Sequence, residues 1–212
     1  MPRPRASVAV RAALYLLAIG AVGAGVSLMV EAHLGVAPND VLNTGLAEPL
    51  GMGVGTAAWI TGVAAMLLAW ALGRRPLVPT ILGSVVVGLV INGGVALLPT
   101  PDLLAVRTGF LLFGLALIWA GITAVVAADV GAGPLELVML GLMDRGVGIR
   151  IARWGIELTL VTLGLLLGGA AGLGTVLFAF CTGPVLAVTL PRAVERLGTN
   201  LSQPTEVACA GP

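Results

Sequence analysis

The sequence predicts an all-α membrane protein: six transmembrane helices in two inverted-topology three-helix repeats, each repeat with a short interfacial or re-entrant helix. Three observations lead to this fold class. Charged residues make up 10% of the 212 residues and hydrophobic residues 58%, whereas about 25% of residues are charged in an ordinary soluble domain. Several stretches of about 20 residues carry almost no charge, which is long enough to cross ~30 Å of hydrocarbon as a helix. A short motif containing Pro and an acid occurs once in each half of the chain.

The uncharged stretches define the predicted spans. Helix is the expected conformation because lipid offers no partners for backbone N–H and C=O groups. The first stretch follows a basic start, as in a signal peptide. Its apolar run is longer than a signal core, and a copy recurs inside the chain, so we expect a retained helix. The six spans are Val8–Val30, Val54–Leu72, Leu77–Leu97, Ala105–Ala128, Ile149–Gly168 and Gly172–Leu190.

The repeated motif predicts two further helices that are too short to cross a bilayer. It reads "GVAPNDVL" in the first half and "GAGPLELV" in the second. Pro38 and Pro134 suit the first turn of a helix, and Asp40 and Glu136 then lie near the positive end of the helix dipole. The predicted short helices are Pro38–Leu50 and Pro134–Gly146. At ~1.5 Å per residue, each reaches only about 20 Å.

The similarity between the two halves extends well beyond this motif. An ordered series of distinctive residues recurs at a nearly constant offset: Arg11/Arg107, Gly35/Gly131, Pro38/Pro134, Gly45/Gly141, Trp59/Trp154, Gly73/Gly168, Thr80/Thr175 and Gly88/Gly183. Each half holds three spans, an odd number, so the second copy enters the bilayer from the opposite side. Inverted repeats of this kind recur among secondary transporters.

This pattern predicts one transmembrane domain over residues 1–190, with repeats at about 8–97 and 105–190, followed by a tail. The tail, residues 191–212, is polar and is expected to be cytoplasmic and disordered. The chain has no lysine, and with six spans ten of its 11 arginines fall on one side, with only Arg107 on the other. The positive-inside rule therefore places both termini in the cytoplasm of a bacterium, with the protein in its cytoplasmic (inner) membrane.

The candidate substrate- or ion-binding residues are Glu157, Arg153, Asp40, Glu136, Pro38, Pro134 and Asn92. Glu157 is the only acid well inside a predicted span, where a charge needs a partner, water or a proton. Arg153 precedes it by one helical turn, so the two form either a snorkelling pair or part of an ion site. Asn92 either joins helices or lines a path. The two Pro-acid turns either cap surface helices or aim helix N-termini at a central solute.

Two functional classes remain open at this point. The first is a transporter or permease for a small solute or ion, and the second is a non-transporting scaffold or accessory protein that supports a partner. An enzyme is not expected, because the chain has no HExxH motif, no Ser–His pairing and no acidic metal set. No cofactor or metal site is predicted. The expected partners are the lipid bilayer, a small solute or cation, and a second copy of the chain, and a net charge of +1 argues against nucleic acid.

The segments "GVAPNDVLNTGLAEPLGMGVGTAAW" and "GAGPLELVMLGLMDRGVGIRIARWGIELTLVTLGLLLGG" resemble the YczE/YitT-like group of bacterial membrane proteins. The resemblance covers nearly all of Arg11–Leu190 and is closest to the YczE branch. Members of that branch resemble this chain in having the duplicated Gly-x-x-Pro-x-acid motif. They also have a basic residue and a Glu in the fifth span, here Arg153 and Glu157. The chain departs from the pattern at Asn39 and Leu135, where an aromatic or basic residue is expected, and it lacks the soluble C-terminal domain of the YitT branch. The group is mostly uncharacterised, so the resemblance implies fold and location more than activity.

Overall fold

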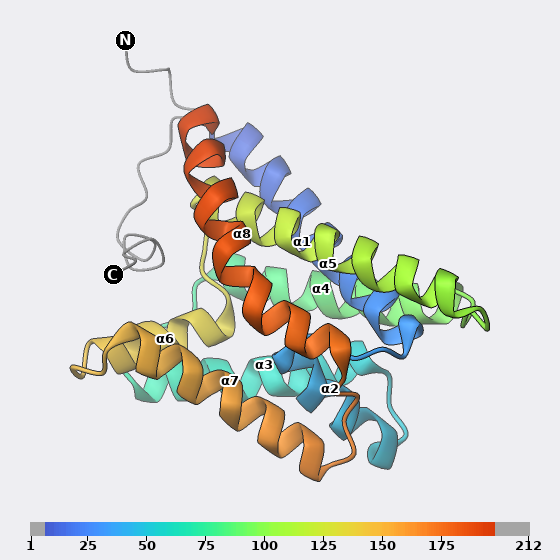
Figure 1. The fold of residues 1–212 in the computed structure, drawn as a ribbon. Coiled ribbons are helices and arrows are strands. Elements are labelled where there is room, and N and C mark those ends of the chain that lie inside the picture. Colours follow the sequence, from blue (N-terminus) through green and yellow to red (C-terminus); the bar gives the residue numbers. More distant parts are fainter. Residues whose placement is uncertain (1–6, 198–212) are drawn as a thin grey trace.

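The computed structural model describes residues 7–197, and this part of the chain folds entirely into helices and connecting loops (Figure 1). Each half contains a long helix, a short helix and then two further long helices. The elements are α1 (Val8–Ala32), α2 (Pro38–Leu50), α3 (Val54–Ala71), α4 (Val78–Leu97), α5 (Leu104–Ala128), α6 (Pro134–Met143), α7 (Ile149–Leu166) and α8 (Leu173–Leu197). The all-helical prediction is therefore confirmed for the described residues.

Five of the described helices are long and apolar enough to cross a membrane: α1, α3, α4, α5 and α8. Their outward-facing side chains include Leu17, Leu67, Leu89, Phe113 and Phe180, as a lipid-facing surface requires. α7 has 18 residues but carries Arg150, Arg153 and Glu157, and it is not among the five. Length and hydropathy therefore support five spans, one fewer than predicted.

The short helices begin where the sequence predicts. Pro38 and Pro134 each occupy the first turn, where a missing N–H costs nothing. α2 ends at Leu50 and is followed by Gly51, whose left-handed φ of 61° a glycine adopts without strain. α6 stops at Met143, three residues before the predicted Gly146. α8 continues to Leu197, and residues 198–212, most of the predicted tail, lie outside the described residues.

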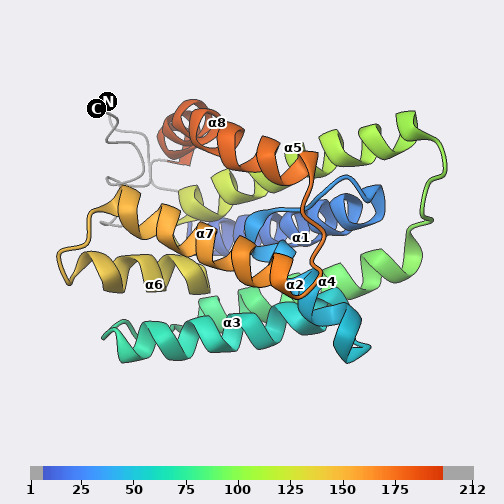
Figure 2. The same cartoon turned by 60° about the horizontal axis from the view of Figure 1, so that its bottom comes forward.

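α1 and α5 cross at the centre of the bundle. α4 packs on the far side of α1, and α8 packs on α5 (Figure 2). A Cβ added at Gly25 would lie 2.6 Å from the carbonyl oxygen of Gly114, and a Cβ at Gly114 would lie 2.7 Å from that of Gly25. The two backbones are therefore in direct contact. Small residues allow this close approach, which supplies the packing energy between helices in lipid.

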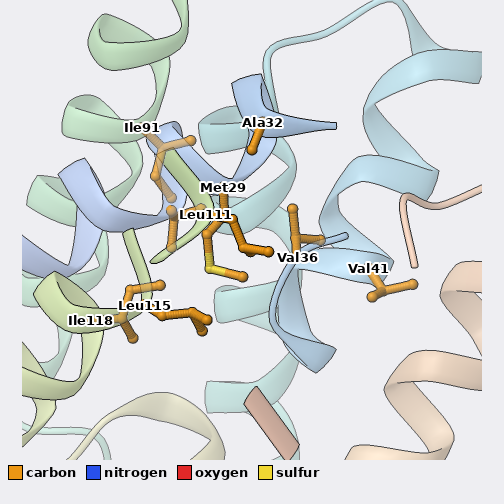
Figure 3. Close-up of a cluster of buried hydrophobic side chains, with 9 residues drawn as sticks. Met29, Ala32, Val36, Val41, Ile91, Leu111, Leu115 and Ile118 are labelled. Carbon is orange, nitrogen blue, oxygen red and sulfur yellow. The ribbon is translucent and has the colours of Figure 1, made fainter. Parts of the chain in front are cut away.

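A cluster of buried apolar side chains lies beside this crossing (Figure 3). We call it the central cluster; its members are Val26, Met29, Ala32, Val36, Val41, Ile91, Leu111, Leu115 and Ile118. Each is at most 4% exposed, so the cluster leaves no room for a solute where α1, α4 and α5 meet the start of α2.

The two short helices begin inside the bundle and run outward from it. In Figures 1 and 2 the chain turns back from the end of α1 before α2 begins, and it turns back from the end of α5 before α6 begins. α2 packs against α3 and α7, and α6 packs against the same two helices. The loop that leads into each short helix is held by a threonine hydroxyl: Thr175 donates to the carbonyl of Val36 (2.7 Å), and Thr80 donates to that of Ala132 (2.8 Å).

Candidate functional site

A cavity of about 330 Å³ lies between the two halves of the protein. Its walls come from α1, α3, α4 and α5, and the first turns of both short helices reach it through Asn39 and through Pro134–Glu136. The polar side chains in the lining are Tyr15, Asn39, Thr61, Thr80, Ser84 and Glu136. The volume falls within the range of small-molecule pockets. This is the site where the structure brings helix N-termini and polar side chains together.

Glu136 is the only charged residue among those that line this cavity. Its Oε2 accepts a hydrogen bond from the Gly133 N–H at 2.7 Å, which caps the first turn of α6. The bond holds the carboxylate against its own helix N-terminus, where the dipole favours negative charge. Pro134 begins the helix beside it. Two of the predicted site residues, Pro134 and Glu136, therefore lie at the cavity.

The hydroxyl groups of the lining are held by carbonyl or amide oxygens of the protein. Tyr15 donates to the carbonyl of Pro79 at 2.7 Å, and Ser84 donates to that of Thr80 at 2.9 Å. Thr80 donates to Ala132, as described above, and Thr61 donates to Oδ1 of Asn43 at 2.7 Å. These bonds fix the side-chain positions and leave the oxygen lone pairs free to face the cavity.

Asp40 is not among the residues that line the cavity, but it is connected to its wall. Its side chain is buried, and its Oδ1 accepts a hydrogen bond from the Asn43 amide at 2.9 Å. Burial raises the pKa of the Asp40 carboxyl to about 6, although the bond from Asn43 opposes this shift. Because Asn43 also accepts from Thr61, Asp40 connects to the cavity wall through two hydrogen bonds. Pro38, which begins α2, is buried beside it.

The remaining predicted site residues lie away from the cavity. Glu157 accepts a hydrogen bond from Arg153 at 3.1 Å, one turn apart on α7, with side chains 24% and 41% exposed. Asn92 joins α4 to α3: its Oδ1 accepts from the Gly55 N–H at 2.8 Å, and its amide donates to Thr56 at 3.0 Å. None of the three lines the cavity between the halves.

A second hollow, of about 410 Å³, lies between α1, α5 and α8. Its lining contains one charged side chain, Arg196, and two hydroxyls that bond each other, those of Thr123 and Thr189 (2.8 Å). The first cavity, with its acid and its two helix starts, is therefore the stronger candidate site.

Tyr15 and Ser84 line the cavity but are not among the candidate residues that the sequence predicts. Both lie within long, mainly apolar helices, and neither belongs to a motif that marks it. The one available signal is that Tyr15 is the only tyrosine of the chain.

Comparisons with known proteins identify relatives over most of the chain. An uncharacterised protein of Haemophilus influenzae is 33% identical over 174 residues, 82% of this chain and 80% of that protein. The uncharacterised membrane protein YczE of Bacillus subtilis is 31% identical over 196 residues, 89% of each chain. No solved structure matches. The model of a family of unknown function, DUF6198, matches residues 9–191. These matches confirm the predicted resemblance to YczE, and the chain belongs to the DUF6198 family of unknown function.

Proposed function

We propose that this protein is a transporter or permease for a small solute or ion in the bacterial cytoplasmic membrane, and that the cavity between its halves is the binding site. The main support is the convergence of two helix N-termini on one cavity, through Asn39 and Glu136. Discontinuous or half-helices that end at a central site are the recurring device of secondary transporters. A scaffold that only holds a partner has no need of such a cavity.

The proposal includes an inverted repeat, which is supported by bonds that occur in pairs. Arg11 donates to the backbone carbonyls of Ala128 (2.6 Å) and Asp129 at the end of α5. Arg107, its sequence counterpart, donates to those of Ala32 (2.7 Å) and His33 (3.1 Å) at the end of α1. The two cap residues also share a left-handed backbone, with φ of 52° at His33 and 49° at Asp129.

In this topology α7 is the sixth span, and both termini are cytoplasmic. The ion pair between Arg153 and Glu157 lowers the cost of carrying charge into the bilayer, because each group supplies a partner for the other. The arginine bias supports the orientation, because ten of 11 then face the cytoplasm.

The cavity and the central cluster lie along stretches of α1 and α5 that correspond to each other in the repeat. Five cavity-lining residues of α1 and α5 have counterparts at the offset of the repeat: Tyr15/Leu111, Ile19/Leu115, Val22/Ile118, Ile122/Val26 and Val125/Met29. All five counterparts belong to the closed central cluster. Of these two positions related by the repeat, one is therefore open and the other is filled. A carrier with one side open and the other closed has this asymmetry, and exchanging the two arrangements would expose the site to the opposite side.

Transport is tested with purified protein in proteoliposomes, by uptake and by solid-supported-membrane currents across a panel of ions, amines, amino acids and vitamins. Gly62→Leu is the blocking variant. Gly62 lines the cavity, and a Cβ there would meet only the Ser84 side chain, at 3.9 Å. Gly93→Leu is the matched control, since a Cβ there has no neighbour within 4 Å. We expect at least one solute to give a signal that Gly62→Leu abolishes and Gly93→Leu retains. A panel without any such signal favours the scaffold.

We further propose Glu157 as a second ionisable group for transport, in keeping with its position inside a predicted span. Glu157→Gln keeps the shape of the side chain and removes its charge. It should leave folding intact and abolish proton- or cation-coupled uptake. Normal uptake would assign Glu157 a structural role, and failure to fold would make its pair with Arg153 a structural link.

A further inference from the structure

The polar groups that face the cavity between the halves offer mainly hydrogen-bond acceptors. A hydroxyl has one hydrogen to donate, and those of Tyr15, Thr61, Thr80 and Ser84 are all donated to protein oxygens. Only lone pairs remain on these four oxygens. Glu136, when ionised, is an acceptor only, and the Asn39 amide is the one lining side chain with both kinds of group. A ligand that bonds to this lining must therefore bring its own donors.

The charge of the lining points the same way. Glu136 is negative, and no arginine is among the lining residues. The N-termini of α6 and α2 would otherwise attract an anion. The dipole of α6, however, already faces the Glu136 carboxylate, which accepts the Gly133 N–H, and the first turn of α2 carries its own acid, Asp40. An anionic ligand would meet this carboxylate without a compensating cation, whereas a cation would pair with it.

The apolar part of the lining decides between kinds of cation. Ile19, Val22, Val87, Ile122 and Val125 form much of the wall. A bare inorganic ion would lose hydration against these side chains without recovering it. An organic cation with a short hydrocarbon body buries that body there, and each buried methylene contributes about 0.8 kcal/mol.

We propose that the cavity binds a small organic ammonium ion, whose N–H groups bond to the Glu136 carboxylate and the hydroxyl oxygens and whose hydrocarbon part lies against the apolar wall. The assignment rests on the proposed function in taking this cavity for the site of the transported solute. Binding itself, however, is measured without transport.

The test is isothermal titration calorimetry of the purified full-length protein with four probes: n-butylammonium chloride, butan-1-ol, sodium butyrate and sodium or potassium chloride. We expect butylammonium to bind and the neutral and anionic analogues of the same length to fail. Equal binding of butan-1-ol or butyrate would overturn the assignment, as would the absence of butylammonium binding. Displacement of butylammonium by sodium or potassium would make this an inorganic cation site instead.

Two variants locate the bound probe. Glu136→Gln keeps an oxygen for the Gly133 N–H but removes the charge, so butylammonium should bind roughly tenfold to a hundredfold more weakly, as expected for losing a charge-assisted bond. Gly62→Leu should abolish binding by filling the cavity. The controls, Glu48→Gln on the exposed end of α2 and Gly93→Leu, should bind as the wild type does. Unchanged binding by Glu136→Gln would overturn the assignment. Binding without transport would contradict the proposed function alone, whereas uptake of an anion or neutral solute through this cavity would contradict the ammonium assignment alone.

Discussion

At the scale of single residues, the two arginines Arg11 and Arg107 explain an exception in the charge distribution. Arg107 is the one arginine that the proposed topology leaves outside the cytoplasm. Its guanidinium bonds to the last carbonyls of α1, and Arg11 does the same for α5. These carbonyls have no partner within their own helices, and they carry the negative end of the dipole. The bonds to the end of α1 therefore account for the position of Arg107, and in the proposed topology they outweigh the preference of arginine for the cytoplasmic side.

We expect Arg107→Ala and Arg11→Ala both to destabilise the protein, and Arg11→Ala the more, because Arg11 also forms an ion pair with the Asp129 carboxylate at 3.4 Å. Each substitution removes two hydrogen bonds from a charged donor, and one such bond is worth about 1.5–3 kcal/mol. Thermal unfolding in detergent, followed by tryptophan fluorescence, measures the effect. Arg75→Ala, at an exposed arginine of the α3–α4 loop, is the control and should leave Tm nearly unchanged. An equal fall of Tm in the control would show that the loss of any positive charge has the same effect.

Asp40 predicts how stability depends on pH. Its folded-state pKa, about 6, lies above the ordinary value of 3.8 because the carboxyl is buried. The folded protein therefore holds this proton more tightly than the unfolded chain does, and stability falls as pH rises from about 4 to about 6. Asp40→Asn keeps an oxygen for Asn43 and cannot ionise. We expect the variant to have a higher Tm than the wild type at pH 8 and the same Tm at pH 4. A constant difference across this range would contradict the pKa shift.

At the scale of elements, the short helices show how far local sequence determines structure. The bounds of α2 follow from Pro38 at its first turn and Gly51 after its end, both readable from the sequence. α6 ends earlier than predicted, at Met143, and the chain after it makes tertiary bonds: Arg145 donates to the carbonyls of Leu72 and Ala71, and Arg74 donates to the Asp144 carboxylate. No local pattern announces such a contact. Likewise, Trp59 donates to the carbonyl of Val85 on α4, whereas its counterpart Trp154 is 60% exposed.

If the short helices turn back without crossing the bilayer, their ends differ in accessibility. We expect Leu50→Cys, 58% exposed at the end of α2, to react with a membrane-impermeant maleimide from outside intact cells. Asp144→Cys, just after α6, should react only from the cytoplasmic side of inverted vesicles. Both are made in a Cys181→Ala, Cys209→Ala background. Labelling of Leu50→Cys from the cytoplasm would rule out the turn-back arrangement of α2.

At the scale of the whole molecule, the candidate site exists only through the crossing of helices that are distant in sequence. Tyr15, Thr80 and Glu136 come from three different helices, α1, α4 and α6. The uncharged stretches predict the long helices, and the repeated motif predicts Glu136. Which helix faces meet across the bundle depends on packing, as at Gly25 and Gly114. Glu157 is the conspicuous acid in the sequence because it lies inside a predicted span. Packing nevertheless places Glu136, and not Glu157, at the cavity.

The open cavity and the closed central cluster lead to a prediction about the whole fold. If the protein alternates between a state with an open cavity and a state with an open cluster, a side chain added in the cavity should favour the second state. In that state the cavity region is packed, so it can accommodate the added side chain. Ile118, 2% exposed in the cluster, is the counterpart of the cavity residue Val22. Ile118→Cys should therefore react faster with an impermeant maleimide from outside when combined with Gly62→Leu than alone or with the matched Gly93→Leu. Equal rates in all three proteins would indicate that the cluster is a fixed core and that the cavity opens to one side only.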